Sequence, residues 1–363
     1  MYKIVTGGLL MSHSLQHRSK RKKRRRRIAV FLILPLLCIL IGGIGYAAYL
    51  YIKAEHVAQA AYKELDRGSK SSKRLEAVKP LEDNISILIM GVDESEARKK
   101  DTEDFGGSFR TDALLLATLN KDDKSIKLVS IPRDTYVYIP SKERKNKIAH
   151  AYAYGGANGT IQTVEDFLDV PVDYYVKVNF DSFIKIVDTL GGIDMDVPIS
   201  VTDFNSKKSG FVTVEKGQHK LNGEQALVLA RARHIDNDFM RGQRQQLIIE
   251  AIAKKALSLN SVTKMADLIE AAGSEMETNL TFDDMIGVVK TMLGTQLNME
   301  KLQVKDIDEY IDGIYYAKPD EQSVKEIKET LKQHLGLTSA TDEDEATDEA
   351  TDTTQHTDEE ENQ

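Results

Sequence analysis

The chain has 363 residues, with 49 Lys and Arg against 57 Asp and Glu, and a formal net charge of −8. Its one cysteine, Cys38, lies in an apolar run, which excludes a disulfide framework, a cysteine-based zinc site and a thiol nucleophile. The charge is segregated. The first 53 residues hold 11 basic residues and no carboxylate, and the segment from Thr338 onward holds 11 carboxylates and no Lys or Arg. This asymmetry indicates a membrane or polyanion at one end and a solvated tail at the other.

The N-terminal region combines a basic cluster with a long apolar segment. Arg18–Arg27 has nine basic residues in ten, and the 25 residues of Ile28–Ile52 follow without one charge. A transmembrane helix needs about 20 apolar residues. We therefore predict a basic cytoplasmic segment over residues 1–27 and a transmembrane helix over residues 28–52, with everything after it outside the cell membrane. A cleaved signal peptide has a shorter apolar core than this segment, which argues against cleavage. Nucleic-acid binding would account for the basic cluster but not for the apolar segment beside it, so a membrane-topology signal is the simpler interpretation.

The remaining sequence divides into a stalk, a folded domain and a tail. Residues 53–81 are polar and predict a helical or flexible stalk, residues 82–337 predict the domain, and the acidic residues 338–363 predict a disordered tail. Within the domain, apolar patterns predict strands at Ile85–Val92, Ala113–Asn120, Ser125–Ile131, Asp173–Phe180, Ile193–Val197 and near Leu302–Val304. They predict helices at Ile161–Leu168, Ser182–Leu190, Gly223–Ala230, Arg241–Leu257, Met265–Ala272, Phe282–Met292 and Glu321–His334. Strands alternating with helices favour an α/β layered domain, a sheet with helices on its faces.

Two carboxylates lie at the ends of the first two predicted strands. Asp93 follows the first strand, and Asp112 lies in Arg110-Thr111-Asp112 at the start of the second. If these strands are neighbours, the two carboxylates converge at one edge of the sheet. Together with substrate phosphates they would suit Mg²⁺, although single aspartates at strand ends are commonly plain surface residues.

The segment Arg231–Gln246 (RARHIDNDFMRGQRQQ) carries the sharpest chemical signal. It holds four arginines between two apolar helical patterns. Asp238 is a good N-cap for the second helix, and Arg241 and Gln245 then share a face of its first turns with that residue. A helix N-terminus with arginine side chains favours phosphate binding.

Other polar residues permit both a structural and a functional interpretation. Arg133-Asp134 ends the third strand and is either a local ion pair or part of an anion site. Lys147 follows a basic loop and can reach an anion. His150 is either structural or a general base, and we leave it unassigned.

An apolar set from the fourth strand and the next helix is either core or the lining of a lipid channel. Val176, Val178 and Phe180 share one side of the predicted strand, and Phe183 and Ile186 share a face of the helix.

In combination, these motifs resemble the LytR-CpsA-Psr family of cell-wall glycopolymer ligases. The resemblance covers roughly Arg18 to Leu335 and rests on GVD, RTDALLLATLN, SIPRDTYV, KIAHAYAYGG and RARHIDNDFMRGQRQQ. It implies a single-pass anchor and an α-β-α layered sandwich with a central mixed sheet. It also implies a membrane-bound phosphotransferase that moves a glycopolymer phosphate, such as wall teichoic acid, from an undecaprenyl-pyrophosphate carrier to peptidoglycan.

The resemblance assigns site residues by position. It implies that Asp93 and Asp112 hold Mg²⁺, and that the catalytic residues are Asp112, Arg110, Arg231 and Arg233. Pyrophosphate binding falls to Arg110, Arg133, Lys147, Arg231, Arg233, Arg241 and Gln245. The sequence departs from the family pattern in a longer acidic insert after Asp93 and in Ala149, which stands where Asn is usual.

Three alternatives remain. They are an anion-binding or sensing module without turnover, a hydrolase of the same pyrophosphate carrier, and a transcriptional regulator, as the family label suggests. A regulator would need its basic residues beside DNA in the cytoplasm, so no nucleic-acid partner is expected. The proton acceptor stays open, with Asp112 and Asp134 as candidates.

Overall fold

In the computed structural model the chain forms two units, Met1–Lys53 and Ala54–Gln363. The central sheet and the helices that cover it belong to the second unit. The structure describes residues 46, 48–93, 109–233, 235, 237–258, 262–273, 276–293 and 297–337. The predicted transmembrane helix therefore lies outside the described residues up to position 45, as do the predicted cytoplasmic segment and the acidic tail. Among the residues described, we find no helix with the length and apolar character needed to cross a bilayer.

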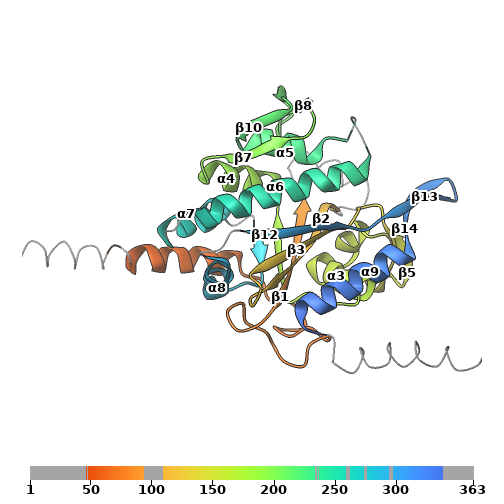
Figure 1. The fold of residues 1–363 in the computed structure, drawn as a ribbon, viewed down its shortest axis with the longest axis horizontal. Helices are drawn as coiled ribbons and strands as arrows, with labels where there is room; N and C mark the ends of the chain where they lie inside the picture. The colour runs from red at the N-terminus through yellow and green to blue at the C-terminus, as the bar shows by residue number, and fades with distance from the viewer. Residues whose placement is uncertain are drawn as a thin grey trace, which may run out of the picture. The chain divides into compact units, whose positions relative to one another are not determined.

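A six-stranded mixed sheet forms the centre of the domain, with strand order β11-β6-β1-β2-β3-β12 (Figure 1). Its strands are β1 (Ile85–Val92), β2 (Thr111–Asn120), β3 (Ser125–Ser130), β6 (Tyr174–Val178), β11 (Glu277–Thr278) and β12 (Asn298–Gln303). The first three strands pair antiparallel, whereas β6 runs parallel to β1 and β12 runs parallel to β3. The first two predicted strands are neighbours, which is the condition under which Asp93 and Asp112 converge.

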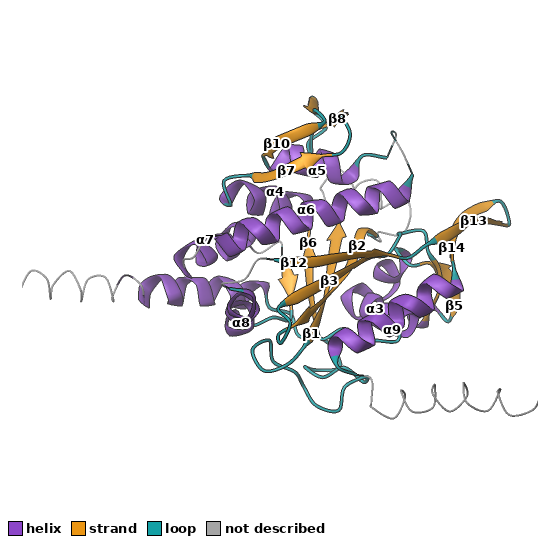
Figure 2. Ribbon diagram, viewed as in Figure 1, coloured by secondary structure: helices purple, strands orange, loops and turns teal. Residues whose placement is uncertain are grey.

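Helices cover both faces of this sheet (Figure 2). They are α3 (His150–Leu168), α4 (Phe180–Thr189), α5 (Gly223–Arg231), α6 (Asp238–Ser258), α7 (Val262–Ala272), α8 (Phe282–Met292) and α9 (Glu321–Leu335). Side chains alternate along β2, so Leu114 and Leu116 pack with α3 and α9, and Leu115 packs with α6 and α8. Burial on both faces explains the continuous apolar runs of β1 and β2. The layered α/β architecture with a mixed central sheet is confirmed.

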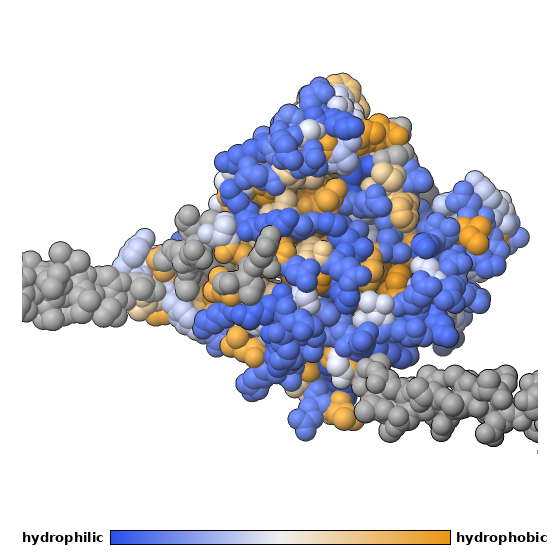
Figure 3. All heavy atoms as spheres, in the orientation of Figure 1, coloured by the Kyte–Doolittle hydropathy of each residue, from blue (hydrophilic) through white to orange (hydrophobic). Residues whose placement is uncertain are grey.

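Short two-stranded sheets complete the domain. They are β4 (Tyr136–Ile139) with β5 (Arg144–Lys147), β7 (Ile193–Val197) with β10 (Gly217–Leu221), β8 (Val201–Phe204) with β9 (Phe211–Val214), and β13 (Asp306–Ile311) with β14 (Ile314–Pro319). A short 3₁₀ helix, η1 (Pro140–Lys142), joins β4 to β5. Of these strands the sequence predicted β7 alone. The β13–β14 hairpin exposes Ile307 and Ile314, and Figure 3 shows hydrophobic atoms on it.

Two predicted helix starts need correction. Phe180 does not end a strand; it begins α4, where Asn179 caps the helix by accepting a hydrogen bond from the Ser182 backbone N–H. The N-cap of α6 is Asn237 rather than Asp238, since the Asn237 side chain accepts from the Met240 backbone N–H at 3.0 Å.

Part of the predicted stalk packs against the domain. Residues 54–61 are helical, and Ala54 and Ala58 are buried against Ile269 and Phe282. Further along, Arg74 forms a bidentate ion pair with the buried Asp173, at 2.7 and 3.0 Å. Burial of this kind holds the segment to the sheet, so the domain begins before position 82.

The last turn of α9 contacts the β2–β3 hairpin through hydrogen bonds of His334. Its ring nitrogens lie 2.7 Å from Thr118 Oγ1 and 2.9 Å from Ser125 Oγ. Burial, together with the positive charge of Lys127, lowers the pKa of His334 to about 4. The imidazole is therefore neutral at pH 7 and acts as a structural hydrogen-bonding group.

Candidate active site

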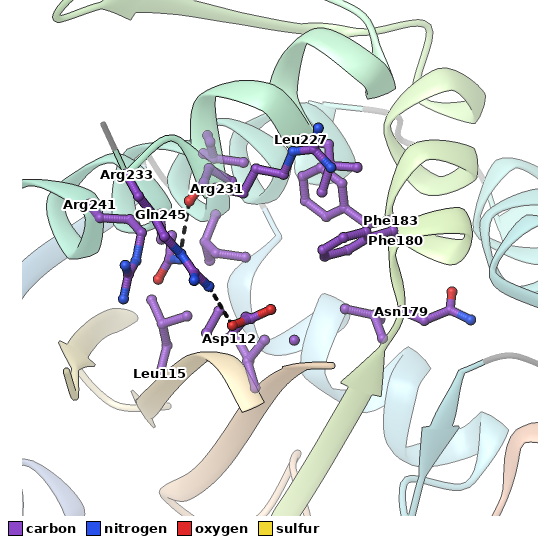
Figure 4. A pocket seen from close by; sticks show the side chains of 17 residues that line it. Asp112, Leu115, Asn179, Phe180, Phe183, Leu227, Arg231, Arg233, Arg241 and Gln245 are labelled. Carbon is purple, nitrogen blue, oxygen red and sulfur yellow. Dashed lines mark hydrogen bonds and ion pairs between the residues drawn. The ribbon is translucent and has the colours of Figure 1, made fainter. Parts of the chain in front are cut away.

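A pocket opens between the sheet and the α4, α5 and α6 layer, with about 690 Å³ of empty space, part of it open to solvent (Figure 4). Apolar side chains form most of its wall: Ile89, Leu115, Val178, Phe180, Phe183, Leu227, Ile248 and Ile249. Its polar side chains are Asp112, Asn179, Arg231, Arg233, Arg241 and Gln245. An apolar cavity with a few convergent polar groups is typical of a ligand site.

The predicted lipid-channel residues divide into two groups. Val178, Phe180 and Phe183 line the pocket. Val176 and Ile186 do not; they pack in a neighbouring apolar cluster with Ala61, Ala272 and Met276. Since Val178 belongs to both, this cluster continues directly from the pocket wall.

Antiparallel pairing of β1 and β2 positions the two predicted metal-binding carboxylates. Val92 pairs with Thr111, so Asp93, just after β1, and Asp112, the second residue of β2, lie at the same edge of the sheet. The register shifts at Gly91, where a Cβ would meet Ala113 Cβ at 3.1 Å. Arg110 is exposed at the same edge and is not among the pocket-lining residues, and the insert between the strands, residues 94–108, lies outside the described part of the chain.

Asp112 is the shared partner of two arginines. Its Oδ1 accepts from Arg233 Nη2 at 2.6 Å and from Arg133 Nη1 at 3.1 Å, and the first of these bonds is drawn in Figure 4. The carboxylate side chain is 17% exposed. Residues about 120 positions apart in sequence thus meet at the pocket mouth, and two cations are held there by one carboxylate.

A second ion-pair network lies beside the first. Asp134 is buried; its Oδ1 contacts Lys147 Nζ at 2.9 Å and its Oδ2 lies 3.4 Å from Arg133 Nε. Burial alone would raise the pKa of Asp134, but the hydrogen bond from Lys147 and the charges of Arg133 and Lys147 lower it below its ordinary value. Lys147 therefore lies against Asp134 and not among the residues that line the pocket.

The arginine-rich segment forms the upper wall of the pocket. Arg231 is the last residue of α5; its Nη2 donates to the backbone carbonyls of Phe204 and Asn205, and its guanidinium lies 5.8 Å from the Phe180 ring centre. Arg233 follows after a non-helical Ala232 and turns toward Asp112. The two arginines thus reach the pocket from one short turn.

The first two turns of α6 add Arg241 and Gln245. Arg241 is 4% exposed and pairs with Asp238 at 2.5 Å. Burial lowers the pKa of Arg241 below its ordinary value, yet an arginine remains charged at neutral pH. Gln245 donates to the Ala230 carbonyl at 3.2 Å.

One important residue of this segment was missed by the sequence reasoning. Arg244 is 2% exposed, and its guanidinium donates to the carbonyls of Leu229 at 3.1 Å and Ala232 at 2.7 Å. It therefore holds the turn that carries Arg231 and Arg233. The sequence showed it as one of the four arginines of the segment, but not that its side chain is buried.

The predicted Mg²⁺ site has a limited set of ligands. In the part of the chain that the structure describes, no group of three or more His, Cys, Asp or Glu side chains is close enough to hold a metal ion. Asp93 and Asp112 fit a Mg²⁺ that takes its other ligands from water and from substrate phosphates, as this ion usually does.

His150 lies near the charged side chains of Arg110 and Lys147. Its Nδ1 is buried and has no hydrogen bond. Burial and the positive charges of Arg110 and Lys147 lower the pKa of His150 to about 4, so the ring is neutral at pH 7.

Comparison with known proteins gives this site its context. The chain is 36% identical over 330 residues to a Bacillus subtilis polyisoprenyl-teichoic acid–peptidoglycan teichoic acid transferase, TagT, covering 89% of this chain and all of the relative. TagU of the same organism is 36% identical over 320 residues, covering 88% of this chain and 99% of the relative.

Solved structures of TagT have the same fold as this chain. A structure of TagT bound to LI-WTA superposes with a TM-score of 0.63 at 35% identity, covering 76% of this chain and 99% of that one. A LytR-CPS2A-psr family protein (TagT) with bound octaprenyl pyrophosphate lipid superposes with a TM-score of 0.59 at 34% identity, covering the same shares of the two chains. The LytR_cpsA_psr family model matches residues 48–333, and the chain belongs to this family.

Proposed function

We propose that this chain transfers a glycopolymer phosphate, of the wall-teichoic-acid type, from an undecaprenyl-pyrophosphate carrier to peptidoglycan. The observation that carries the proposal is a single pocket in which an apolar wall meets Arg231, Arg233 and Arg241. A polyprenyl pyrophosphate has the matching chemistry, an apolar chain joined to two phosphates. The names of the relatives and the lipid in one of the related structures support the same substrate class.

Donor binding follows from the two halves of the pocket. The polyprenyl chain lies along Val178, Phe180 and Phe183, and the pyrophosphate lies among the arginine side chains. Arginine forks bind phosphate oxygens in pairs, which fixes the orientation of the phosphorus as well as its charge. Because Asp112 already accepts from Arg133 and Arg233, the pyrophosphate replaces this carboxylate as their acceptor.

The reaction is a phosphoryl-group displacement. An acceptor hydroxyl of peptidoglycan attacks the phosphorus that bears the glycopolymer, a new P–O bond forms, and the bond to the bridging oxygen of the pyrophosphate breaks. Polyprenyl phosphate leaves with that electron pair, and the hydroxyl proton passes to a nearby base or to water. Positioning and charge neutralisation by the arginines supply most of the catalysis in such a transfer.

Asp93 and Asp112 are the residues that would hold Mg²⁺ during this reaction, together with phosphate oxygens of the donor. A bound Mg²⁺ would neutralise negative charge on the pyrophosphate. Arg110, exposed at the same edge, is available to the phosphates from the solvent side.

We further propose that a transmembrane helix at residues 28–52 anchors the domain on the outer side of the cell membrane. The basic cluster before that segment supports this orientation. Protease treatment of intact cells should remove an epitope tag placed after Thr338. A protected tag would contradict the orientation and favour the regulator alternative.

Transfer itself is tested with the purified full chain in detergent, a labelled lipid-linked polymer and peptidoglycan. A transferase yields labelled peptidoglycan and an equal amount of polyprenyl phosphate. A hydrolase yields polyprenyl phosphate without labelled peptidoglycan, and a binding module yields neither, so either outcome contradicts the proposal.

Arg231→Ala should lower the transfer rate by roughly 10²–10³, the loss typical of a removed transition-state donor. Lys254→Ala, at an exposed position of α6, is the matched control and should keep full activity. Equal rates for the two variants would remove Arg231 from the site.

A further inference from the structure

A second groove lies between the β4–β5 hairpin, the C-terminal end of α3 and the start of α9. It holds about 950 Å³ of empty space open to solvent, and none of its residues lines the arginine pocket. We name it the tyrosine–lysine groove after six of its residues, Tyr136, Tyr138, Lys145, Phe167, Lys325 and Lys328. Figure 1 shows β5, β14, α3 and α9 on the same side of the domain. Lys145, from the basic loop before Lys147, forms part of its wall.

Strand alternation explains why the groove is aromatic. Val137 and Ile139 of β4 are buried in the core, so Tyr136 and Tyr138 point to the opposite face. The Tyr138 side chain is 50% exposed. The Tyr136 ring lies 4.7 Å from that of Tyr316 on β14, which holds it in place. Aromatic faces with a polar tip at the surface suit the C–H faces and hydroxyls of sugar rings.

Lysines lie beside these rings. Tyr138 pairs with Lys145 across the hairpin, and Lys145 Nζ lies 5.8 Å from the Tyr136 ring centre. Lys325 and Lys328 are one turn apart on α9 and reach the same groove. Two carboxylates, Asp166 and Glu321, also line it, so cations outnumber anions three to two. This local excess stands out in a chain whose net charge is −8.

The groove lies close to the catalytic edge through the β4–β5 hairpin. Tyr136 lies three residues after Arg133, which spans at most about 10 Å of chain. Lys147, directly across the hairpin from Tyr136, pairs with Asp134, whose other oxygen faces Arg133. A chain that leaves the pyrophosphate site along this hairpin therefore meets the rings and lysines of the groove.

We propose that the tyrosine–lysine groove binds the sugar–phosphate repeats of the donor glycopolymer. The inference rests on the proposed function, because that function supplies a donor with a long polyanionic glycan. Tyrosines pack against the sugars and lysines pair with the phosphates between them. Each contact is weak in a solvated groove. Several repeats bound together raise the local concentration of the donor phosphate at the arginines.

The test measures binding of a polymer that lacks the lipid and the pyrophosphate. Fluorescent poly(glycerol phosphate) is titrated with the full chain in detergent micelles, and neutral dextran of similar length is the comparison probe. Lys145→Glu with Lys328→Glu should weaken polyanion binding about tenfold, equivalent to about 1.4 kcal/mol. Tyr138→Ala should weaken binding at high salt as well as at low salt, because stacking is not screened as charge is. Lys290→Glu on α8, an exposed charge change outside the groove, should leave binding unchanged.

Each outcome is decisive for the groove. Unchanged binding by the double lysine variant, or dextran binding as tight as that of the polyanion, would overturn the proposal. The double variant should also lose transfer of long-chain donors while it retains transfer of a donor with a single repeat. If the proposed function failed, the unaltered chain would bind the polyanion but would transfer no donor. Arg231→Ala should also bind the polyanion and lose transfer, but only relative to an active parent, because Arg231 lies outside the groove.

Discussion

Asp112 offers the sharpest test of the site, because neutralising it should separate donor binding from turnover. Its Oδ1 holds Arg233 at 2.6 Å and Arg133 at 3.1 Å. In Asp112→Asn the side chain keeps its size and loses its charge. Two arginines are then released from their internal counter-ion, which favours an incoming pyrophosphate. The same change removes a predicted Mg²⁺ ligand and the group that orients both guanidinium planes.

The expected magnitudes differ for the two steps. Partly exposed ion pairs contribute about 0.2–1 kcal/mol each, so stability should change by no more than about 2 kcal/mol. Donor affinity should stay equal or rise, because pyrophosphate no longer competes with the carboxylate. The rate constant kcat should fall by roughly 10²–10³, as for loss of one preorganised electrostatic group.

Two assays measure these quantities. Binding of a fluorescent octaprenyl pyrophosphate reports donor affinity, and transfer of labelled polymer at saturating donor reports kcat. Asp196→Asn, at an exposed position of β7, is the matched control and should change neither. Turnover of Asp112→Asn within threefold of the parent, or a parallel loss of affinity and kcat, would refute the reasoning.

Three further predictions concern the support of the site. The pKa of His334 is about 4 in the folded chain and about 6.5 in the unfolded chain, so the unfolded state binds more protons between those pH values. The free energy of unfolding should therefore fall by about 3 kcal/mol from pH 6.5 to pH 4. In urea titrations, His334→Gln should flatten this dependence on pH. Gly242→Ala places a Cβ 2.6 Å from Ser130 Oγ, which should cost about 1–3 kcal/mol of stability and shift the start of α6, with a matching loss of transfer. Asn237→Ala removes the cap of the Met240 N–H and should cost about 1 kcal/mol in thermal unfolding.

Matched changes make these three results interpretable. His219→Gln replaces an exposed imidazole outside the α9 contact and is the matched control. Gly210→Ala has no atom within 4 Å of the new Cβ and should be tolerated. For the cap, Asn237→Ser restores a side-chain acceptor and should recover most of the stability. An Ala substitution at Gly242 as harmless as that at Gly210 would show that α6 can move away from β3 without cost.

Long apolar runs and the arginine segment were readable from the sequence because each has a strong local pattern. The residues of β1 and β2 are buried on both faces, so their continuous hydrophobicity marks them as central strands. Arg231, Arg233, Arg241 and Gln245 reach one pocket because a turn and a helix start follow each other directly.

What the sequence could not predict depends on tertiary pairing. The direction in which Lys147 points is decided by Asp134, a residue 13 positions away across a loop. Val176 and Ile186 carry the same apolar signal as Phe183, and only the packing of the segment around Ala61 separates core from pocket wall. The β4 strand alternates over only four residues and β5 is entirely polar, so neither strand has a period that stands out.

The order of the strands also dictates when the site can form. Gln246, next to the arginines of α6, donates to the carbonyls of Leu128 on β3 and Leu302 on β12. In sequence order β12 is the last strand of the central sheet. His334 of α9, which contacts Thr118 of β2, comes 216 residues after that threonine. A growing polypeptide therefore carries every arginine of the pocket well before it contains the pieces that hold their helix. Contacts this distant make folding slow, and the contact of Gln246 with β12 forms only after synthesis has passed Leu302.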